Sequence, residues 1–134
     1  MNIFDLALTH YIVIPVNCVG VMGGGLALQY KEQFPSGYNT YKQACHRGLI
    51  RVGQCFFIGG EESGAILFPT KDHYKDPSKL EWIKSGMEDM KRQAEMFGIT
   101  KIAMPRIGCG LGGLAWKDVK PIIDSFDMKE LVYV

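Results

Sequence analysis

The sequence predicts a single α/β domain, built as a three-layer sandwich with helices on both faces of a sheet. Its 134 residues match the usual size of one compact domain. Short apolar runs alternate with amphipathic stretches along the chain, which is typical of alternating strands and helices. Apolar residues make up 47% of the sequence and charged residues 22%, so the chain can bury a sizeable core. We therefore expect one domain over residues 1–134.

A continuous apolar run indicates the first strand, and a four-residue apolar repeat indicates the first helix. Residues 11–16 (YIVIPV) are apolar and rich in β-branched side chains, which predicts a central strand that is covered on both faces. Apolar residues then recur every four positions, which predicts a helix from Gly24 or Gly25 to Phe34. Pro35 ends this helix because proline cannot continue it.

A second helix and a hairpin are expected next. The helix covers residues 36–47 and stops at a glycine. Two apolar runs follow at residues 54–58 and 65–69, and residues 59–64 (GGEESG) between them have the composition of a hairpin loop. We therefore expect these two strands to pair directly.

The longest helix carries the best-marked boundaries. Ser78 and Glu81 predict a capping box that satisfies two backbone N–H groups at its start, and Gly98 ends it. Apolar residues recur in steps of three and four between these limits, which predicts one stripe against the sheet. A strand, a glycine-rich turn, a helix and a last strand are expected after it, over residues 101–107, 108–114, 116–126 and 130–134.

Composition and charge exclude several classes of function. Fifteen basic and fourteen acidic side chains leave a net charge of +1, so no overall field draws the protein to nucleic acid or to a membrane. The apolar run near the start is far too short to span a bilayer, and Asp5 lies where a signal peptide would be basic. We expect a cytoplasmic protein that does not bind a membrane.

The cysteines and histidines do not predict a metal site. Cys18, Cys45, Cys55 and Cys109 are widely separated, and no pair has the C-x-x-C spacing of a zinc site. The three histidines are equally dispersed. We expect free thiols, no metal and no cofactor.

Two glycine-rich loops follow predicted strands and lead into predicted helices. The first is residues 17–25 (NCVGVMGGG) and the second is residues 108–114 (GCGLGGL). Ligands bind at this edge of an open α/β sheet, and glycine lets backbone N–H groups converge on phosphate oxygens beside a helix N-terminus. Each loop alone could be a simple tight turn. Two loops placed alike predict a diphosphate held between them.

The second loop also matches a dinucleotide-binding fingerprint, which its position argues against. Gly108, Gly110 and Gly113 give the pattern G-x-G-x-x-G. That motif opens a βαβ unit, whereas only one helix and one strand follow here. No Walker A lysine follows either loop, so the sequence does not support hydrolysis of nucleoside triphosphates.

Three stretches resemble the macro domain family, in the branch that contains the DarG antitoxin and terminal ADP-ribose glycohydrolase. They are VNCVGVMGGGLA with a following FP, then FPTKDH, then MPRIGCGLGGLAW, at residues 16–27, 34–35, 68–73 and 104–116. The resemblance implies a mixed sheet flanked by helices. It also implies binding of ADP-ribose and hydrolysis of an ADP-ribosyl bond on nucleic acid or protein. We expect this chain to depart from the family pattern by lacking the usual first strand.

The resemblance also implies which residues form the site. The catalytic candidates are Lys71, Asn17 and His73, with Lys71 as the catalytic lysine and Asn17 on the distal ribose. The implied ADP-ribose contacts are Asn2, Ile3, Asn17, Cys18, Val19, Gly20, Val21, Met22, Gly23, Gly24, Gly25, Leu26, Pro69, Thr70, Lys71, Pro105, Arg106, Ile107, Gly108, Cys109, Gly110, Leu111, Gly112, Gly113 and Leu114. Family members that act on carboxylate-linked ADP-ribose carry an aspartate where this chain has Gly112, which shifts the expected substrate toward nucleic acid.

The chemical role of Lys71 has two interpretations at this stage. A neutral amine could attack the anomeric carbon, whereas an ammonium could stabilise the leaving oxygen or a phosphate. His73 could move a proton near neutral pH. The cluster of Lys71, Lys75, Lys79 and Lys84 could meet a DNA backbone, although a solvated run of lysines has the same pattern.

Three functions follow from these observations. The first is release of ADP-ribose from an ADP-ribosylated macromolecule, with DNA among the candidates. The second is removal of phosphate from ADP-ribose 1″-phosphate, with Asn17, Lys71 or His73 on the terminal phosphate. The third is binding of ADP-ribose without turnover. The expected partner is ADP-ribose or its macromolecular conjugate, and the expected state is a monomer.

Overall fold

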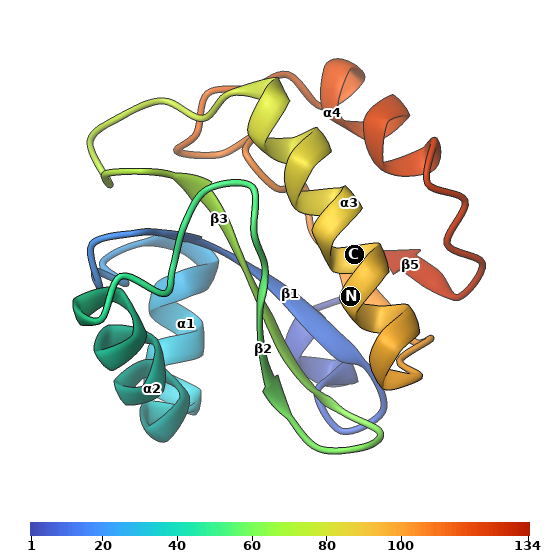
Figure 1. Ribbon diagram of the computed structural model, residues 1–134, viewed down its shortest axis with the longest axis horizontal. Coiled ribbons are helices and arrows are strands. Elements are labelled where there is room, and N and C mark those ends of the chain that lie inside the picture. Colours follow the sequence, from blue (N-terminus) through green and yellow to red (C-terminus); the bar gives the residue numbers. More distant parts are fainter.

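A computed structural model describes all residues 1–134, and its centre is a mixed five-stranded sheet (Figure 1). The strand order is β2-β3-β1-β4-β5. Only β2 runs antiparallel, against β3, while the other neighbours pair in parallel. The strands are β1 (Tyr11–Asn17), β2 (Phe56–Gly59), β3 (Gly64–Lys71), β4 (Ile102–Met104) and β5 (Leu131–Tyr133). The mixed sheet and the predicted hairpin are both confirmed.

Helices cover both faces of this sheet, so the predicted three-layer arrangement is confirmed (Figure 1). The helices are α1 (Gly25–Gln33), α2 (Pro35–His46), α3 (Leu80–Phe97) and α4 (Trp116–Asp124), after a 3₁₀ turn η1 (Ile3–Leu6) that the sequence analysis did not predict. In Figure 1, α1 and α2 lie on one side of the strands, and α3 and α4 lie on the other. None of the helices combines the length and apolar character needed to cross a lipid bilayer.

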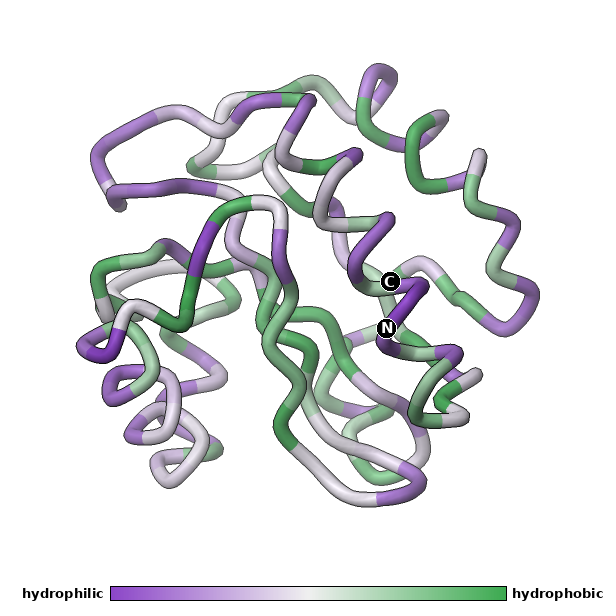
Figure 2. Tube along the Cα trace, in the orientation of Figure 1, coloured by the Kyte–Doolittle hydropathy of each residue, from purple (hydrophilic) through white to green (hydrophobic).

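The position of β1, between helices on both faces of the sheet, explains why its sequence is apolar throughout. Tyr11 and Val13 join one buried cluster with α3 and α4, while Ile12 and Ile14 join another with α1 and α2. Successive side chains of a strand point to opposite faces, so a strand with helices on both sides needs apolar residues at every position. Figure 2 shows hydrophobic colour along these central strands.

The predicted capping box at the start of α3 is wrong. The helix begins at Leu80, with Lys79 as its N-cap residue and no capping bond from a side chain. Ser78 instead points into the protein, where its Oγ is buried without a hydrogen-bond partner. Its N–H donates to Gly112 O at 2.9 Å. The tertiary contact with the second glycine loop has therefore replaced the local cap.

The strand predicted over residues 101–107 is shorter than expected. It comprises only Ile102–Met104, and the chain then turns, with the Ile107 N–H donating to Pro105 O at 2.9 Å. Proline has no N–H to continue the ladder, so the sheet ends here and the apolar side chain of Ile107 is buried outside it. This early end places the second glycine loop beside the ends of β1 and β3.

The Asp89 carboxylate connects α3 to the segment before β2 by hydrogen bonds. One carboxylate oxygen accepts hydrogen bonds from Cys55 N and Gln93 Nε2, both at 2.7 Å, and the other accepts from Arg92. Burial pushes the pKa of Asp89 up, but these donors outweigh burial and hold the pKa below its usual value. The ionised carboxylate therefore stabilises the fold.

We expect Asp89→Ala to lower the free energy of unfolding by about 2 kcal/mol at pH 7, because it leaves the Cys55 N–H without its charged acceptor. The wild-type protein should lose this stabilisation as the pH falls below about 4, through the lowered pKa of Asp89. Urea unfolding at pH 7 and at pH 3 measures both effects, with the exposed Glu88→Ala as control. An equal loss at both pH values would contradict the electrostatic explanation.

Candidate functional site

A cavity of about 680 Å³ lies where the parallel strands β1, β3 and β4 end. Its size lies in the range of pockets that bind cofactors and other small ligands. Both glycine-rich loops line it, as the sequence predicts. The lining residues are Pro15, Val16, Asn17, Val21, Gly23, Gly24, Gly25, Leu26, Ala27, Thr70, Lys71, Tyr74, Pro105, Arg106, Gly108, Gly110, Leu111 and Gly112.

Asn17 organises the first loop with its side chain. Its Oδ1 accepts from Val19 N at 3.0 Å, and its Nδ2 donates to Val21 O at 2.7 Å. The hydroxyl of Tyr41, on α2, lies 2.8 Å from Oδ1 and 2.7 Å from Asn17 O. Burial raises the pKa of Tyr41, so this hydroxyl remains a protonated donor. The sequence predicts Asn17 as a site residue, but it does not predict the hydrogen bonds from Tyr41 to Asn17.

The first loop presents free backbone donors at the start of α1. No protein group accepts from the N–H groups of Gly23, Gly24 and Gly25. Gly25 has φ +56°, in the left-handed region that glycine adopts readily. Unsatisfied N–H groups at a helix N-terminus, together with the positive end of the helix dipole, attract anions. The loop can therefore bind phosphate without a charged side chain.

The second loop is held by its own backbone and leaves four donors free, that of Gly108 among them. Leu114 N donates to Gly108 O at 2.9 Å, and Gly113 N donates to Gly110 O at 3.2 Å. No protein group accepts from the N–H groups of Gly110, Leu111 and Gly112, all of which line the cavity. This loop can therefore hydrogen-bond to anionic oxygens from a second side.

Gly112 sits where no side chain fits. A Cβ atom added there would lie 2.4 Å from Gly108 O and 2.4 Å from Ser78 Oγ. Both distances are far below contact distance, and one neighbour is backbone. This loop conformation therefore could not accommodate the aspartate that the resemblance implies for family members acting on carboxylate-linked ADP-ribose.

The two loops meet over the cavity. A Cβ atom on Gly24, in the first loop, would lie 3.5 Å from Leu111 Cδ1 in the second, which is ordinary contact distance. The free donors of both loops thus border one space. This arrangement can hold a diphosphate from two sides.

Lys71 lies beside Asn17, because the two residues pair in the parallel ladder between β3 and β1. Its Nζ donates to Tyr74 O at 3.2 Å, and the side chain is half-buried. Asp72 follows it, but the carboxylate of Asp72 forms no ion pair with Lys71. The backbone carbonyl of Asp72 accepts from Cys18 N at 3.1 Å and so joins the loop after β3 to the first glycine loop.

Twelve residues of the predicted site do not line the cavity. They are Asn2, Ile3, Cys18, Val19, Gly20, Met22, Pro69, His73, Ile107, Cys109, Gly113 and Leu114. The two nearest the start lie at η1, where Asn2 is the N-cap residue whose Oδ1 accepts from Phe4 N, and Ile3 is buried. His73 lies on the rim, where its Nδ1 accepts from Lys75 N at 3.1 Å.

Four cavity residues were not predicted from the sequence. Pro15, Val16 and Ala27 lie next to predicted positions, at the end of β1 and in the first turn of α1. Tyr74 is different, because it comes from the loop after β3 and is 45% exposed. An aromatic residue in an otherwise hydrophilic loop was the signal that could have found it.

The cysteine next to Asn17 is not a nucleophile. Burial, together with the nearby Asp72 carboxylate, raises the pKa of Cys18 to about 11. The thiol therefore stays protonated near neutral pH, and thiolate chemistry is not available. No three metal-ligating side chains are grouped anywhere in the molecule.

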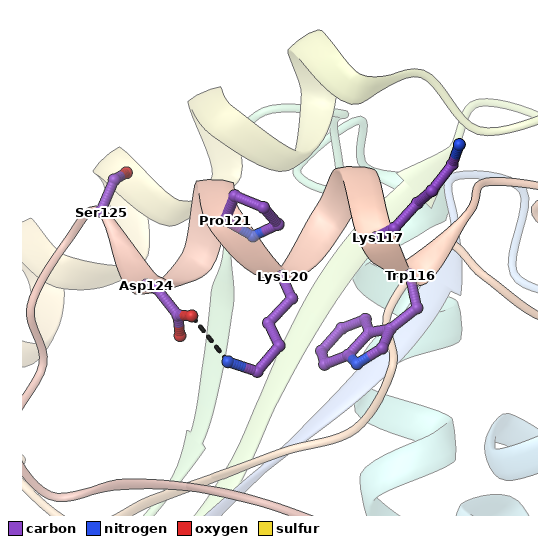
Figure 3. A pocket seen from close by; sticks show the side chains of 6 residues that line it. All are labelled: Trp116, Lys117, Lys120, Pro121, Asp124 and Ser125. Atoms are coloured by element: carbon purple, nitrogen blue, oxygen red, sulfur yellow. Dashed lines mark hydrogen bonds and ion pairs between the residues drawn. The ribbon is translucent and has the colours of Figure 1, made fainter.

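A second hollow, of about 550 Å³, lies along the outer surface of α4 (Figure 3). One helix supplies almost all of it, and the figure shows Lys120 turned toward Asp124. Their side chains form an ion pair at 2.7 Å, so this cation is already neutralised. The hollow offers no convergent backbone donors, and it is separate from the strand ends where ligands bind in α/β sheets.

Comparison with known proteins agrees with this geometry. A family model described as "Macro domain" matches residues 13–123. A Mycobacterium tuberculosis protein named DNA ADP-ribosyl glycohydrolase is 43% identical over an alignment that covers 93% of this chain. The chain spans only 38% of the length of that relative.

Solved structures of the same family superpose closely. The macrodomain of Mycobacterium tuberculosis DarG gives a TM-score of 0.90 at 35% identity, covering 99% of this chain and 92% of the other. Thermosipho africanus DarTG, solved in complex with ADP-ribose, gives a TM-score of 0.89 at 32% identity. That match covers 98% of this chain and 38% of the other. The chain therefore belongs to the macro domain family.

Proposed function

We propose that this protein binds ADP-ribose and hydrolyses the bond that joins ADP-ribose to DNA. The observation that carries the proposal is the pair of glycine loops, whose residues with free N–H groups line one cavity beside Lys71. A pyrophosphate needs donors on both of its phosphates, and the two loops supply them from opposite sides. The relatives named for DNA ADP-ribosyl hydrolysis support the choice of bond.

The position of Lys71 relative to the glycine loops indicates which end of the bound ADP-ribose lies next to Lys71. Lys71 and Asn17 lie side by side at the ends of β3 and β1, whereas the free amides lie on the loops beyond. We therefore place the distal ribose next to Lys71, with its anomeric carbon toward Nζ. Water replaces the leaving group at that carbon, and the leaving group departs with a proton.

Binding is the first step to test. We expect titration calorimetry to show that ADP-ribose binds one site per chain more tightly than ATP or NAD, because neither of these presents a diphosphate followed by a free terminal ribose. The wild-type protein should then release ADP-ribose from an ADP-ribosylated oligonucleotide, followed by chromatography. Preference for ATP would contradict the assignment of the cavity.

Two alternative functions have distinct results in the same assays. Phosphate release from ADP-ribose 1″-phosphate, without release from the oligonucleotide, would identify a phosphatase. Tight binding of ADP-ribose without turnover of either substrate would identify a reader. Either result would keep the ligand and overturn the reaction.

A further inference from the structure

A hydrolase that cuts an ADP-ribosyl bond must hold the leaving group as well as ADP-ribose. The cavity accounts for the ADP-ribosyl half, so the leaving group lies beyond Lys71, at the rim. The rim there is the loop between β3 and α3, residues 72–79, which arches away from the sheet in Figure 1. Figure 2 shows that this loop is hydrophilic along most of its length.

Two stacked aromatic rings, from the half-buried His73 and the exposed Tyr74, lie on this hydrophilic loop, next to Lys71. Tyr74 lines the cavity, and its carbonyl accepts the hydrogen bond from Lys71 Nζ. Its ring stacks on that of His73, with the centroids 4.3 Å apart and the planes at 29°. The Nδ1 atom of His73 accepts from Lys75 N, so the loop backbone holds the stacked pair in place.

One lysine lies over this aromatic pair, and a second lies over a tryptophan ring at the start of α3. Lys75 Nζ lies 5.8 Å from the centroid of the Tyr74 ring, and Lys79 Nζ lies 5.0 Å from that of Trp82. Neither lysine pairs with a carboxylate, since the molecule's two ion pairs lie elsewhere. Aromatic faces next to unpaired cations are the elements with which proteins bind single-stranded nucleic acid.

We propose that Tyr74, backed by His73, is the stacking platform for a nucleobase at the scissile end, and that Lys75 and Lys79 contact the adjoining phosphates. The proposal rests on the proposed function and names the element that receives the leaving nucleotide. A carboxylate-linked protein substrate would present a flexible acidic side chain and has no flat face to stack. The exposed ring therefore favours nucleic acid.

The acidic residues of the loop limit the strength of the phosphate contacts. Asp72 and Asp76 lie on the same loop as Lys75 and Lys79, and Lys71 ends the strand before it, so two carboxylates oppose three lysines. We expect few phosphates to be bound, and therefore a shallow dependence of oligonucleotide binding on salt. Each lost phosphate contact should reduce the slope of log K against log salt by about 0.7 for a single strand.

Replacement of Tyr74 tests the platform. Tyr74→Ala should raise KM for an ADP-ribosylated single-stranded oligonucleotide about tenfold, since a stacked base contributes strongly to binding. Because Tyr74 also lines the cavity, the affinity for free ADP-ribose should fall as well, but by a clearly smaller factor than the rise in KM. Tyr74→Phe keeps the ring and should keep the wild-type KM. Phe97→Ala removes another exposed aromatic side chain, 58% exposed against 45% for Tyr74, at the far end of α3 and is the control.

Replacement of the lysine tests the phosphate contact separately. Lys75→Ala should reduce the salt slope of oligonucleotide binding, whereas the exposed Lys101→Ala, at the opposite end of the strands, should not. Calorimetry with ADP-ribose shows whether each variant is folded. An unchanged slope in Lys75→Ala would remove this lysine from the proposal.

The outcomes separate this inference from the proposed function. If the wild-type protein does not release ADP-ribose from the oligonucleotide, the proposed function fails. If it does, and Tyr74→Ala has the wild-type KM, only the platform is overturned. An equal loss of affinity for free ADP-ribose would place Tyr74 in the ADP-ribose subsite. An equal rise in KM for an ADP-ribosylated glutamate peptide would show that the ring does not read a nucleobase.

Discussion

Lys71→Ala is expected to abolish release of ADP-ribose from modified DNA while leaving ADP-ribose binding in place. Lys71 lines the cavity, and in the proposed complex backbone amides that the substitution does not change would hold the diphosphate. Loss of a group that attacks the anomeric carbon, or that acts in proton transfer, lowers kcat by at least about a hundredfold. Single-turnover release and calorimetry measure the two properties separately.

A second substitution distinguishes the two roles of Lys71. Lys71→Arg keeps a positive charge but cannot form a covalent bond to the sugar, so partial activity would indicate electrostatic stabilisation of the leaving group. No activity, together with a sugar adduct on wild-type Lys71 trapped by borohydride, would indicate a covalent imine. Lys101→Ala is the control for loss of a surface lysine. Wild-type rates in Lys71→Ala would remove Lys71 from the chemistry.

Gly112→Ala should weaken ADP-ribose binding by about tenfold to a hundredfold. The new Cβ would overlap Gly108 O and Ser78 Oγ, so the second loop must move. Its free amides then lose their alignment with the diphosphate, and each hydrogen bond to a charged oxygen contributes about 1.5 to 3 kcal/mol. Calorimetry with ADP-ribose measures the loss directly.

The control for this substitution is a glycine in a different loop. Gly60 lies in the β2–β3 turn, and a Cβ added there would meet nothing within 4 Å. Gly60→Ala should therefore bind ADP-ribose like the wild-type protein. Wild-type affinity in Gly112→Ala would mean that the second loop does not hold the diphosphate.

The sequence could predict the fold and the loops because their signals are local. The apolar run of β1 favours a buried strand, the proline after α1 restricts the backbone, and the glycines after two strands permit tight turns. Because ligands bind at the carboxyl ends of the strands in α/β sheets, the two loops are expected to lie together. These inputs do not depend on distant contacts. The three layers, the hairpin and the shared cavity followed from them.

The parts that were missed depend on contacts between distant segments. Tyr41 supports Asn17 from 24 positions away, so no local pattern links them. Ser78 has the residue type of a helix cap, but its N–H donates to Gly112 O in the second loop instead. Tyr74 reaches the cavity only because its loop folds back over Lys71. Residue type suggests a local role, and tertiary packing decides it.

The free donors of both glycine loops belong to the main chain, which has a consequence for how this protein can evolve. Mutation changes side chains and leaves peptide N–H groups in place, provided that the glycines and the turns they permit are kept. Substitutions at the entrance of the cavity can therefore change the substrate or abolish turnover, while the backbone contacts proposed for the nucleotide are kept. Homologues that catalyse different reactions would still share the backbone N–H groups of the two glycine loops as their site for the diphosphate.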